Sequence, residues 1–257
     1  MRELVYRLQK PTQYLGGEWG RTAKDPSTVR ARLALAFPDF YEVGMSYVGG
    51  RILYEAVNRV EGLAAERVFA PADDAVAVMR ETGTRLATLE SDTPLAACDV
   101  VAFHLTHELC YTSVLHLLDL AGIPFRSAQR AGQGGWPLVV AGGGCAFNAE
   151  PMAPFFDVMV LGDGEKAIVD LLTAVADARE SGASRRQLLE TLAAMPGFYV
   201  PEFFEFDPET GVRSLLPGYE RVDKAIVADL DAAPFPACQV VPFAQAVHDR
   251  LSVEIAR

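Results

Sequence analysis

Residues 30–37, RARLALAF, open the part of the chain that decides the fold. Four more short apolar runs of the same kind follow, at 66–70, 99–105, 137–141 and 157–161. Runs with so little alternation between apolar and polar residues are typical of strands covered on both faces, as in a parallel sheet. The sequence therefore predicts a sheet of five parallel strands.

Segments with helical spacing lie between most of these runs. Apolar residues recur every three or four positions over 47–61 and around 76–79, 114–121 and 167–175. Parallel neighbours need a long, covering connection, and such crossovers are right-handed. The alternation predicts an α/β fold, a flavodoxin-like doubly wound sheet in the order 2-1-3-4-5.

The chain divides into three predicted parts: an N-terminal arm over 1–28, the sheet domain over 29–182, and a linker over 183–257. The linker is expected to contain a helix and a β-hairpin. The helix covers about 184–194 and stops at Met195-Pro196-Gly197. The hairpin consists of FYVPEFFEF (198–206) and VRSLL (212–216) around the turn at 207–211. A last run, 250–255, is typical of a strand that begins another domain.

Composition excludes several function classes. A net charge of −11 argues against a surface that neutralises several phosphates, so we expect no direct nucleic-acid partner. The chain has neither a secretory leader nor an apolar run that would span a membrane, which indicates a cytoplasmic protein without a membrane partner. Four cysteines without a CxxC pair suggest neither a zinc ribbon nor a disulfide framework.

In a sheet of this topology, a ligand binds beyond the carboxyl ends of the strands, where the strand order reverses. The loops at that edge carry glycines or short polar residues, which close approach by a large planar or phosphorylated ligand requires. None is expected to be catalytic. The predicted cofactor-binding residues are Asp39, Tyr41, Gly44, Ser46, Thr106, His107, Gly142, Gly143, Gly144 and Gly162.

Motifs in and around these loops carry a family resemblance. They are KPTQYLGGE (10–18), AFPDFYEVGMS (36–46), RVFAP (67–71), LDLAGIP (118–124), AGGGCAFNAEP (141–151) and DAAPFP (231–236). From about residue 10 onward, the chain resembles the N-terminal part of a family of fused radical S-adenosylmethionine proteins with a cobalamin-binding-like domain.

The resemblance implies a domain that presents cobalamin to a radical barrel. In this family, the segment that ends near Arg257 is followed by a CxxxCxxC loop, which holds a four-iron four-sulfur cluster and S-adenosylmethionine. The resemblance thus implies a chain that stops before this loop and is not catalytic alone. Its partners would be its own missing barrel and a substrate that the sequence does not name.

One position departs from the pattern of cobalamin domains of the methionine-synthase kind. These carry DxHxxG after the first strand, and the histidine coordinates cobalt. Here Asp39, Tyr41 and Gly44 fill that spacing, with tyrosine in place of histidine. A neutral phenol is a poor cobalt ligand beside imidazole, so we expect base-off cobalamin without a histidine ligand. A cofactor-free docking or substrate-recognition module of the same fold is the alternative.

Two further patterns suggest other sites. His104, His107 and Cys110 are closely spaced, as metal ligands often are, but a strand end and the following helix need not bring them together. Residues 162–167, GDGEKA, match the GxGxxA form of a dinucleotide fingerprint. Their acidic residues would face a pyrophosphate, and they are explained as well by the dipole of a helix N-terminus.

Overall fold

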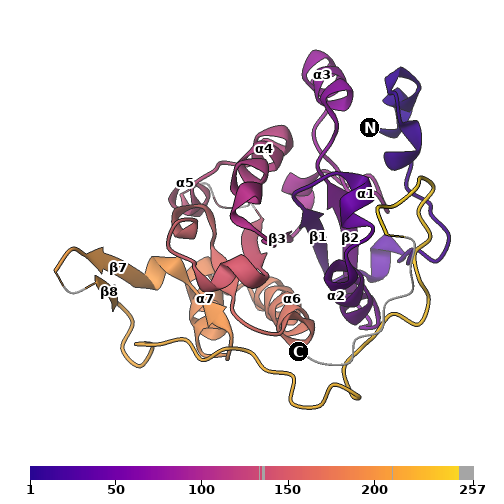
Figure 1. Ribbon diagram of the computed structural model, residues 1–257. Helices are drawn as coiled ribbons and strands as arrows, with labels where there is room; N and C mark the ends of the chain where they lie inside the picture. Colours follow the sequence, from indigo (N-terminus) through magenta and orange to yellow (C-terminus); the bar gives the residue numbers. More distant parts are fainter. Residues whose placement is uncertain (133, 135–136, 210, 249–257) are drawn as a thin grey trace.

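The computed structural model describes residues 1–132, 134, 137–209 and 211–248, and its centre is a six-stranded sheet (Figure 1). The strands lie in the order β2-β1-β3-β4-β5-β6. All neighbours are parallel except β6, which runs antiparallel to β5. The bounds are Ala31–Phe37 for β1, Leu63–Phe69 for β2, Val100–His104 for β3, Leu138–Gly142 for β4, Val158–Val160 for β5 and Phe198–Tyr199 for β6.

The predicted α/β class with a doubly wound sheet is confirmed, but the prediction of a five-stranded, wholly parallel sheet is wrong. The sequence assigns Phe198 and Tyr199 to the hairpin, whereas in the structure they extend the sheet, with Phe198 opposite Val160. Both side chains are buried in the core. A strand of two residues is too short to show a periodic pattern, so only packing reveals it.

Helices cover both faces of this sheet, as the alternation of segments predicts. One layer contains α2, α6 and α7, and the other contains α3 and α4. The bounds are Val48–Asn58 for α2, Asp73–Thr82 for α3, Tyr111–Ala121 for α4, Gly164–Ser181 for α6 and Arg185–Ala193 for α7.

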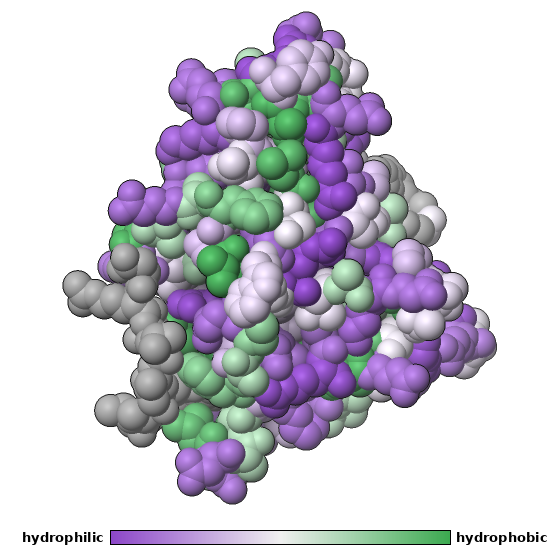
Figure 2. Space-filling view, turned by 90° about the vertical axis from the view of Figure 1, so that its right-hand side faces the viewer, coloured by the Kyte–Doolittle hydropathy of each residue, from purple (hydrophilic) through white to green (hydrophobic). Residues whose placement is uncertain are grey.

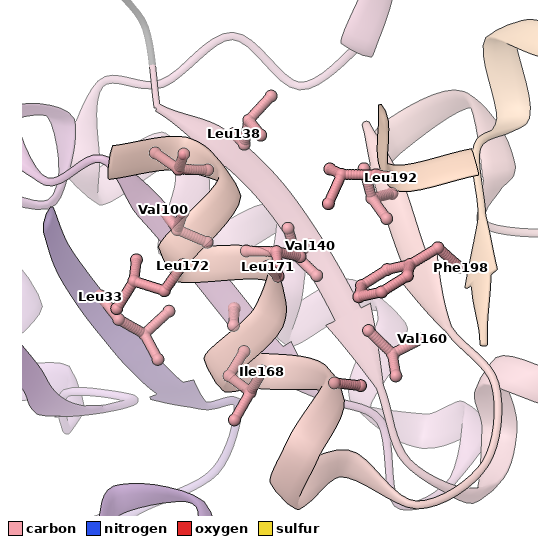
Figure 3. Close-up of a cluster of buried hydrophobic side chains, with 14 of the residues drawn as sticks. Leu33, Val100, Leu138, Val140, Val160, Ile168, Leu171, Leu172, Leu192 and Phe198 are labelled. Atoms are coloured by element: carbon pink, nitrogen blue, oxygen red, sulfur yellow. The ribbon is translucent and has the colours of Figure 1, made fainter. Parts of the chain in front are cut away.

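The larger core lies between the sheet and the layer of α2, α6 and α7. Figure 3 shows Ile168 and Leu172 of α6 facing Leu33, Val100 and Val140 of the strands. Alternate residues of each strand face the opposite core, because successive strand side chains point to opposite sides of a sheet. Covering on both sides explains why the strand sequences are predominantly apolar.

Shorter elements complete the fold. The hairpin expected around residues 207–211 is confirmed: β7 and β8 are antiparallel, with Phe206 opposite Val212. The bounds of the remaining helices and strands are Tyr41–Gly44 for α1, Ser127–Ala131 for α5, Phe204–Asp207 for β7 and Gly211–Ser214 for β8. The 3-10 helices are η1 (Arg2–Arg7), η2 (Pro11–Gln13), η3 (Pro26–Thr28), η4 (Leu95–Ala97), η5 (Glu108–Cys110), η6 (Gly144–Phe147), η7 (Ala153–Phe155) and η8 (Pro201–Phe203).

Residues 215–248, which we call the strap, run from the hairpin back across the carboxyl edge of the sheet (Figure 1). Ala225 forms a parallel bridge with Gly162, and Val241 forms an antiparallel bridge with Trp19 of the N-terminal arm. The strap therefore joins the β5 side of the molecule to the β1 side. The strand predicted at 250–255 lies outside the described residues.

Asp157 is a buried anchor just before β5. Its carboxylate accepts hydrogen bonds from Arg130, Arg185 and the backbone amide of Val139. With several donors around it, the charge is satisfied although the side chain is almost completely buried.

No helix among the described residues is long and apolar enough to span a bilayer.

Candidate functional site

A cleft of about 220 Å³ opens at the carboxyl edge of the sheet, between the first turns of α2 and α6. Ile52 and Leu53 of α2 and Val160 of β5 give it apolar walls, and Gly142 and Gly143 close it on the side of β4. The cleft lies where the strand order reverses, between β1 and β3, which is the position expected for a ligand in a doubly wound sheet.

Three of the ten predicted residues line this cleft: Gly142, Gly143 and Gly162. Gly44 lines a smaller neighbouring cavity. The remaining six follow β1, β3 or β4 at the same edge but are not among the cleft-lining residues: Asp39, Tyr41, Ser46, Thr106, His107 and Gly144. The sequence thus located the edge of the sheet that carries the cleft, but most of the predicted residues do not line the cleft itself.

The glycines after β4 have different reasons to be glycine. Gly143 has a φ of +105°, and a Cβ there would lie 2.7 Å from the carbonyl oxygen of Leu105, so the backbone requires glycine. Gly142 has no such φ, and its Cβ would meet Val160 only at an ordinary contact distance of 3.7 Å. Neither strain nor crowding excludes a side chain at Gly142, and the missing side chain leaves the cleft open.

Tyr41, which stands at the histidine position of the cobalamin motif, is turned into the protein. Its hydroxyl donates a 3.0 Å hydrogen bond to Glu18, and Glu18 in turn pairs with Arg67, which also pairs with Glu90. Burial, and then the charge of Glu18, raises the pKa of the Tyr41 phenol, so it remains a donor. The structure does not bring Tyr41 to the cleft. This side chain anchors the N-terminal arm through Glu18.

The polar candidates in the first and third loops also have local roles. The Asp39 carboxylate accepts from the amide of Phe40, which stabilises the turn before α1. The Ser46 hydroxyl donates to the carbonyl of Glu42 and accepts from the amide of His248 in the strap. Short polar side chains at such places are typical of turns, which the sequence could not distinguish from ligand contacts.

His104 is a cleft residue that the sequence analysis missed as a binding residue. It ends β3, lines the cleft and lies 3.1 Å, through Nε2, from the hydroxyl of Tyr47. Burial lowers the pKa of His104 to about 4, so the imidazole is neutral near pH 7. A signal was present, because the predicted third strand already ended around this residue, at the edge that binds ligands.

The metal pattern does not form a cluster. His107 is exposed, and Cys110 is buried in the core on the other side of the sheet from the cleft. Among the described residues, no group of three His, Cys, Asp or Glu side chains is arranged to hold a metal ion.

The dinucleotide-like run at 162–167 has a different explanation. A Cβ on Gly162 would lie 2.1 Å from the carbonyl oxygen of Ala225, because the strap passes directly over this turn. The amide of Asp163 donates to that same carbonyl, and the Asp163 carboxylate accepts from the amide of Val227. Close passage of the strap therefore accounts for the glycine at 162, as well as for the acidic residue at the start of α6.

Comparison with known proteins identifies the family of the chain. Residues 49–201 match the family described as radical SAM proteins, N-terminal. The chain belongs to this family. The matched segment begins in α2 and ends at the start of η8, just after β6, so the radical SAM N-terminal region contains both helices and most of the strands that form the cleft.

Among solved structures, the chain is similar to two of TsrM, a radical S-adenosylmethionine methyltransferase from Kitasatospora setae. One has tryptophan substrate and a SAM analog bound, with 15% identity, a TM-score of 0.41, and coverage of 74% of this chain and 31% of that one. The other has cobalamin and a four-iron four-sulfur cluster bound, with 17% identity, a TM-score of 0.41, and coverage of 73% and 31%. The chain thus spans about a third of their length. No curated protein matches it.

Proposed function

We propose that this radical SAM N-terminal region is a cofactor-presenting domain, which binds cobalamin base-off at the cleft and supplies no histidine ligand. The observation that carries the proposal is Gly142: it lines the cleft at the carboxyl edge of the sheet, although nothing in the backbone requires glycine there. The two solved TsrM structures make cobalamin a reasonable candidate, since one of them contains it.

The residues of the cleft fit such a ligand. Apolar side chains of Ile52, Leu53 and Ile168 would pack against its uncharged parts, and the backbone at Gly142 and Gly143 allows close approach. When bound, cobalamin would supply methyl-group or electron transfer. The chain's own residues would bind and orient the cofactor and exclude water from it.

The proposal assigns S-adenosylmethionine and the four-iron four-sulfur cluster to a radical barrel outside this chain, which would be its partner. An exposed apolar surface supports such a partner. It contains Trp19 of the arm and Val241 and Phe243 of the strap, which are 71%, 46% and 50% exposed. Figure 2 shows hydrophobic groups gathered on this side of the molecule among hydrophilic ones.

Mixing the purified chain with hydroxocobalamin tests the proposal. After desalting, the visible spectrum should show about one corrin per chain, with the features of the base-off form. A protein that remains colourless at saturating corrin would overturn it. A base-on or histidine-ligated spectrum would retain the binding but contradict the base-off assignment.

The second candidate is a cofactor-free docking or substrate-recognition module. It is favoured by the inward position of Tyr41 and by the apolar surface formed by the arm and the strap. A colourless protein that still binds a separately expressed radical barrel, with binding lost on Trp19→Glu, would support this alternative. Leu109→Glu is the matched control, because Leu109 is another exposed apolar residue but lies in η5, outside the arm and the strap.

A further inference from the structure

The strap occupies the space next to the cleft at the carboxyl edge of the sheet. Its residues 236 and 238–240 line a smaller cavity of about 40 Å³, whose other walls come mainly from β1, β2 and α2. Leu35 and His104 line both the cleft and this cavity. The strap therefore covers the part of the edge that directly adjoins the cleft.

The cleft alone is small for a corrinoid. Its volume of about 220 Å³ lies below the range of roughly 300–1,000 Å³ for small-molecule sites, and a corrin ring with its side chains is larger than most such ligands. A ligand of this size would extend along the sheet edge into the space that residues 236–240 cover. The strap bounds the cleft on its far side as well, since Ala225 passes over Gly162, which lines the cleft.

Between these two sides, the strap is anchored at its ends and exposed in the middle. Ala225 bridges to Gly162, and Val241 bridges to Trp19 of the arm. All residues of the intervening segment, 226–240, are exposed or half-buried except Pro236, and the segment belongs to no helix or strand. A segment with so few buried contacts can leave the body of the protein while its anchors hold.

Two arginines of α2 hold this segment against the body, and the strap passes beside α2 (Figure 1). Arg59 donates to the carbonyl of Phe235 at 3.0 Å, and Arg51 donates to the side-chain oxygen of Gln239 at 2.6 Å. We call the contact between Arg51 and Gln239 the latch. The Nε of Arg51 is buried and has no hydrogen-bond partner among the described residues, so the closed latch leaves one donor unsatisfied.

We propose that residues 226–240 of the strap form a lid that competes with a corrinoid for the carboxyl edge of the sheet, and that the latch opens before the corrinoid binds. This inference rests on the proposed function. The apparent dissociation constant is then the intrinsic constant divided by the fraction of molecules that are open. Changes that loosen the strap should therefore tighten corrin binding, whereas they would weaken it if the strap were part of the binding surface.

Substitutions at Gln239 change the latch in both directions. Gln239→Met removes the acceptor and keeps the length of the side chain, whereas Gln239→Glu pairs Arg51 with a carboxylate, which binds it more strongly than a neutral amide does. The purified chain is titrated spectrophotometrically with hydroxocobalamin. We expect a dissociation constant about 10-fold lower for Gln239→Met and about 10-fold higher for Gln239→Glu, the effect of one hydrogen bond to a charged group on the open fraction.

Two glycines of the arm provide a test that leaves the latch residues intact. A Cβ on Gly20 would lie 2.4 Å from the carbonyl oxygen of Gln239, so Gly20→Ala pushes the strap out of its closed position. Gly17→Ala is the matched control: the φ angles are +80° at Gly20 and +83° at Gly17, but a Cβ on Gly17 meets no strap atom within 4 Å. Gly20→Ala should bind hydroxocobalamin more tightly than Gly17→Ala, by a factor similar to that of Gln239→Met.

The order of affinities decides the outcome. Any order other than Gln239→Met above wild type above Gln239→Glu overturns the inference, and so does a Gly20→Ala variant that binds no more tightly than Gly17→Ala. In these cases the wild type still retains corrin, and the proposed function stands. If neither the wild type nor any variant retains corrin, the proposed function fails, and this inference fails with it.

Discussion

Replacing Gly142 with leucine should close the cleft without unfolding the protein. The new Cβ would lie 3.7 Å from Val160, an ordinary contact, and the backbone carries no positive φ at this residue. The four added carbons would occupy apolar space in the cleft that a ligand would otherwise fill. At about 0.8 kcal/mol for each carbon, this removes about 3 kcal/mol of the burial that the cleft offers a ligand.

A loss of about 3 kcal/mol corresponds to about 100-fold weaker binding. Spectrophotometric titration with hydroxocobalamin should therefore give a dissociation constant at least about 100-fold higher for Gly142→Leu. Urea unfolding of the variant should show no loss of stability, because the leucine packs against existing apolar walls. Gly144→Leu is the control, since a Cβ there meets nothing within 4 Å and the residue does not line the cleft. Unchanged affinity in a folded Gly142→Leu would refute the placement of the ligand.

Three other predictions concern buried polar groups. Tyr41→Phe leaves Glu18 without its phenol donor and should cost about 1.5–3 kcal/mol in urea unfolding, while corrin retention is unchanged; reduced retention would contradict the inward role of Tyr41. The pKa of His104 is about 4 in the folded protein and about 6.5 in the unfolded chain, so the unfolded chain binds the extra proton between these pH values. The contribution of His104 to the free energy of unfolding should be complete above pH 6.5 and should fall by about 3 kcal/mol towards pH 4. In His104→Gln, urea unfolding measured over the same pH range should lack this pH dependence. Asp157→Asn leaves the buried Arg130 without its counter-charge and should lower the free energy of unfolding by about 3–5 kcal/mol, so a change below about 1 kcal/mol in a urea titration would refute that anchor.

The strands and helices that form the two layers could be predicted because their side chains repeat a physical pattern. Residues 33–37 are all apolar, and all five are buried in β1, which is covered on both faces. The α2 and α6 segments place apolar residues every three or four positions, and these are the residues that pack on the sheet. A pattern of this kind is local, so it can be recognised in the sequence without knowing which element packs against it.

The candidate site was predictable only as an edge. Parallel strands bring the loops after β1, β3 and β4 together whatever their sequences, and so the position of the cleft follows from topology. The direction of a side chain within a loop depends on the hydrogen-bond partners and packing surfaces that distant parts of the chain place near it. Tyr41 turns inward because Glu18, from a distant arm, accepts its hydrogen bond.

The sequence by itself determined the class of fold, the layers of helices and the edge that carries the cleft, because these depend on periodicity and on the rules that connect parallel strands. Tertiary structure decided the rest. The sixth strand forms because Phe198 pairs with Val160, and the glycine at 162 is explained by the strap that passes over it. The His104 imidazole lies within hydrogen-bond distance of the Tyr47 hydroxyl, which comes from another part of the chain. Each depends on contact between residues distant in sequence, which local patterns do not encode.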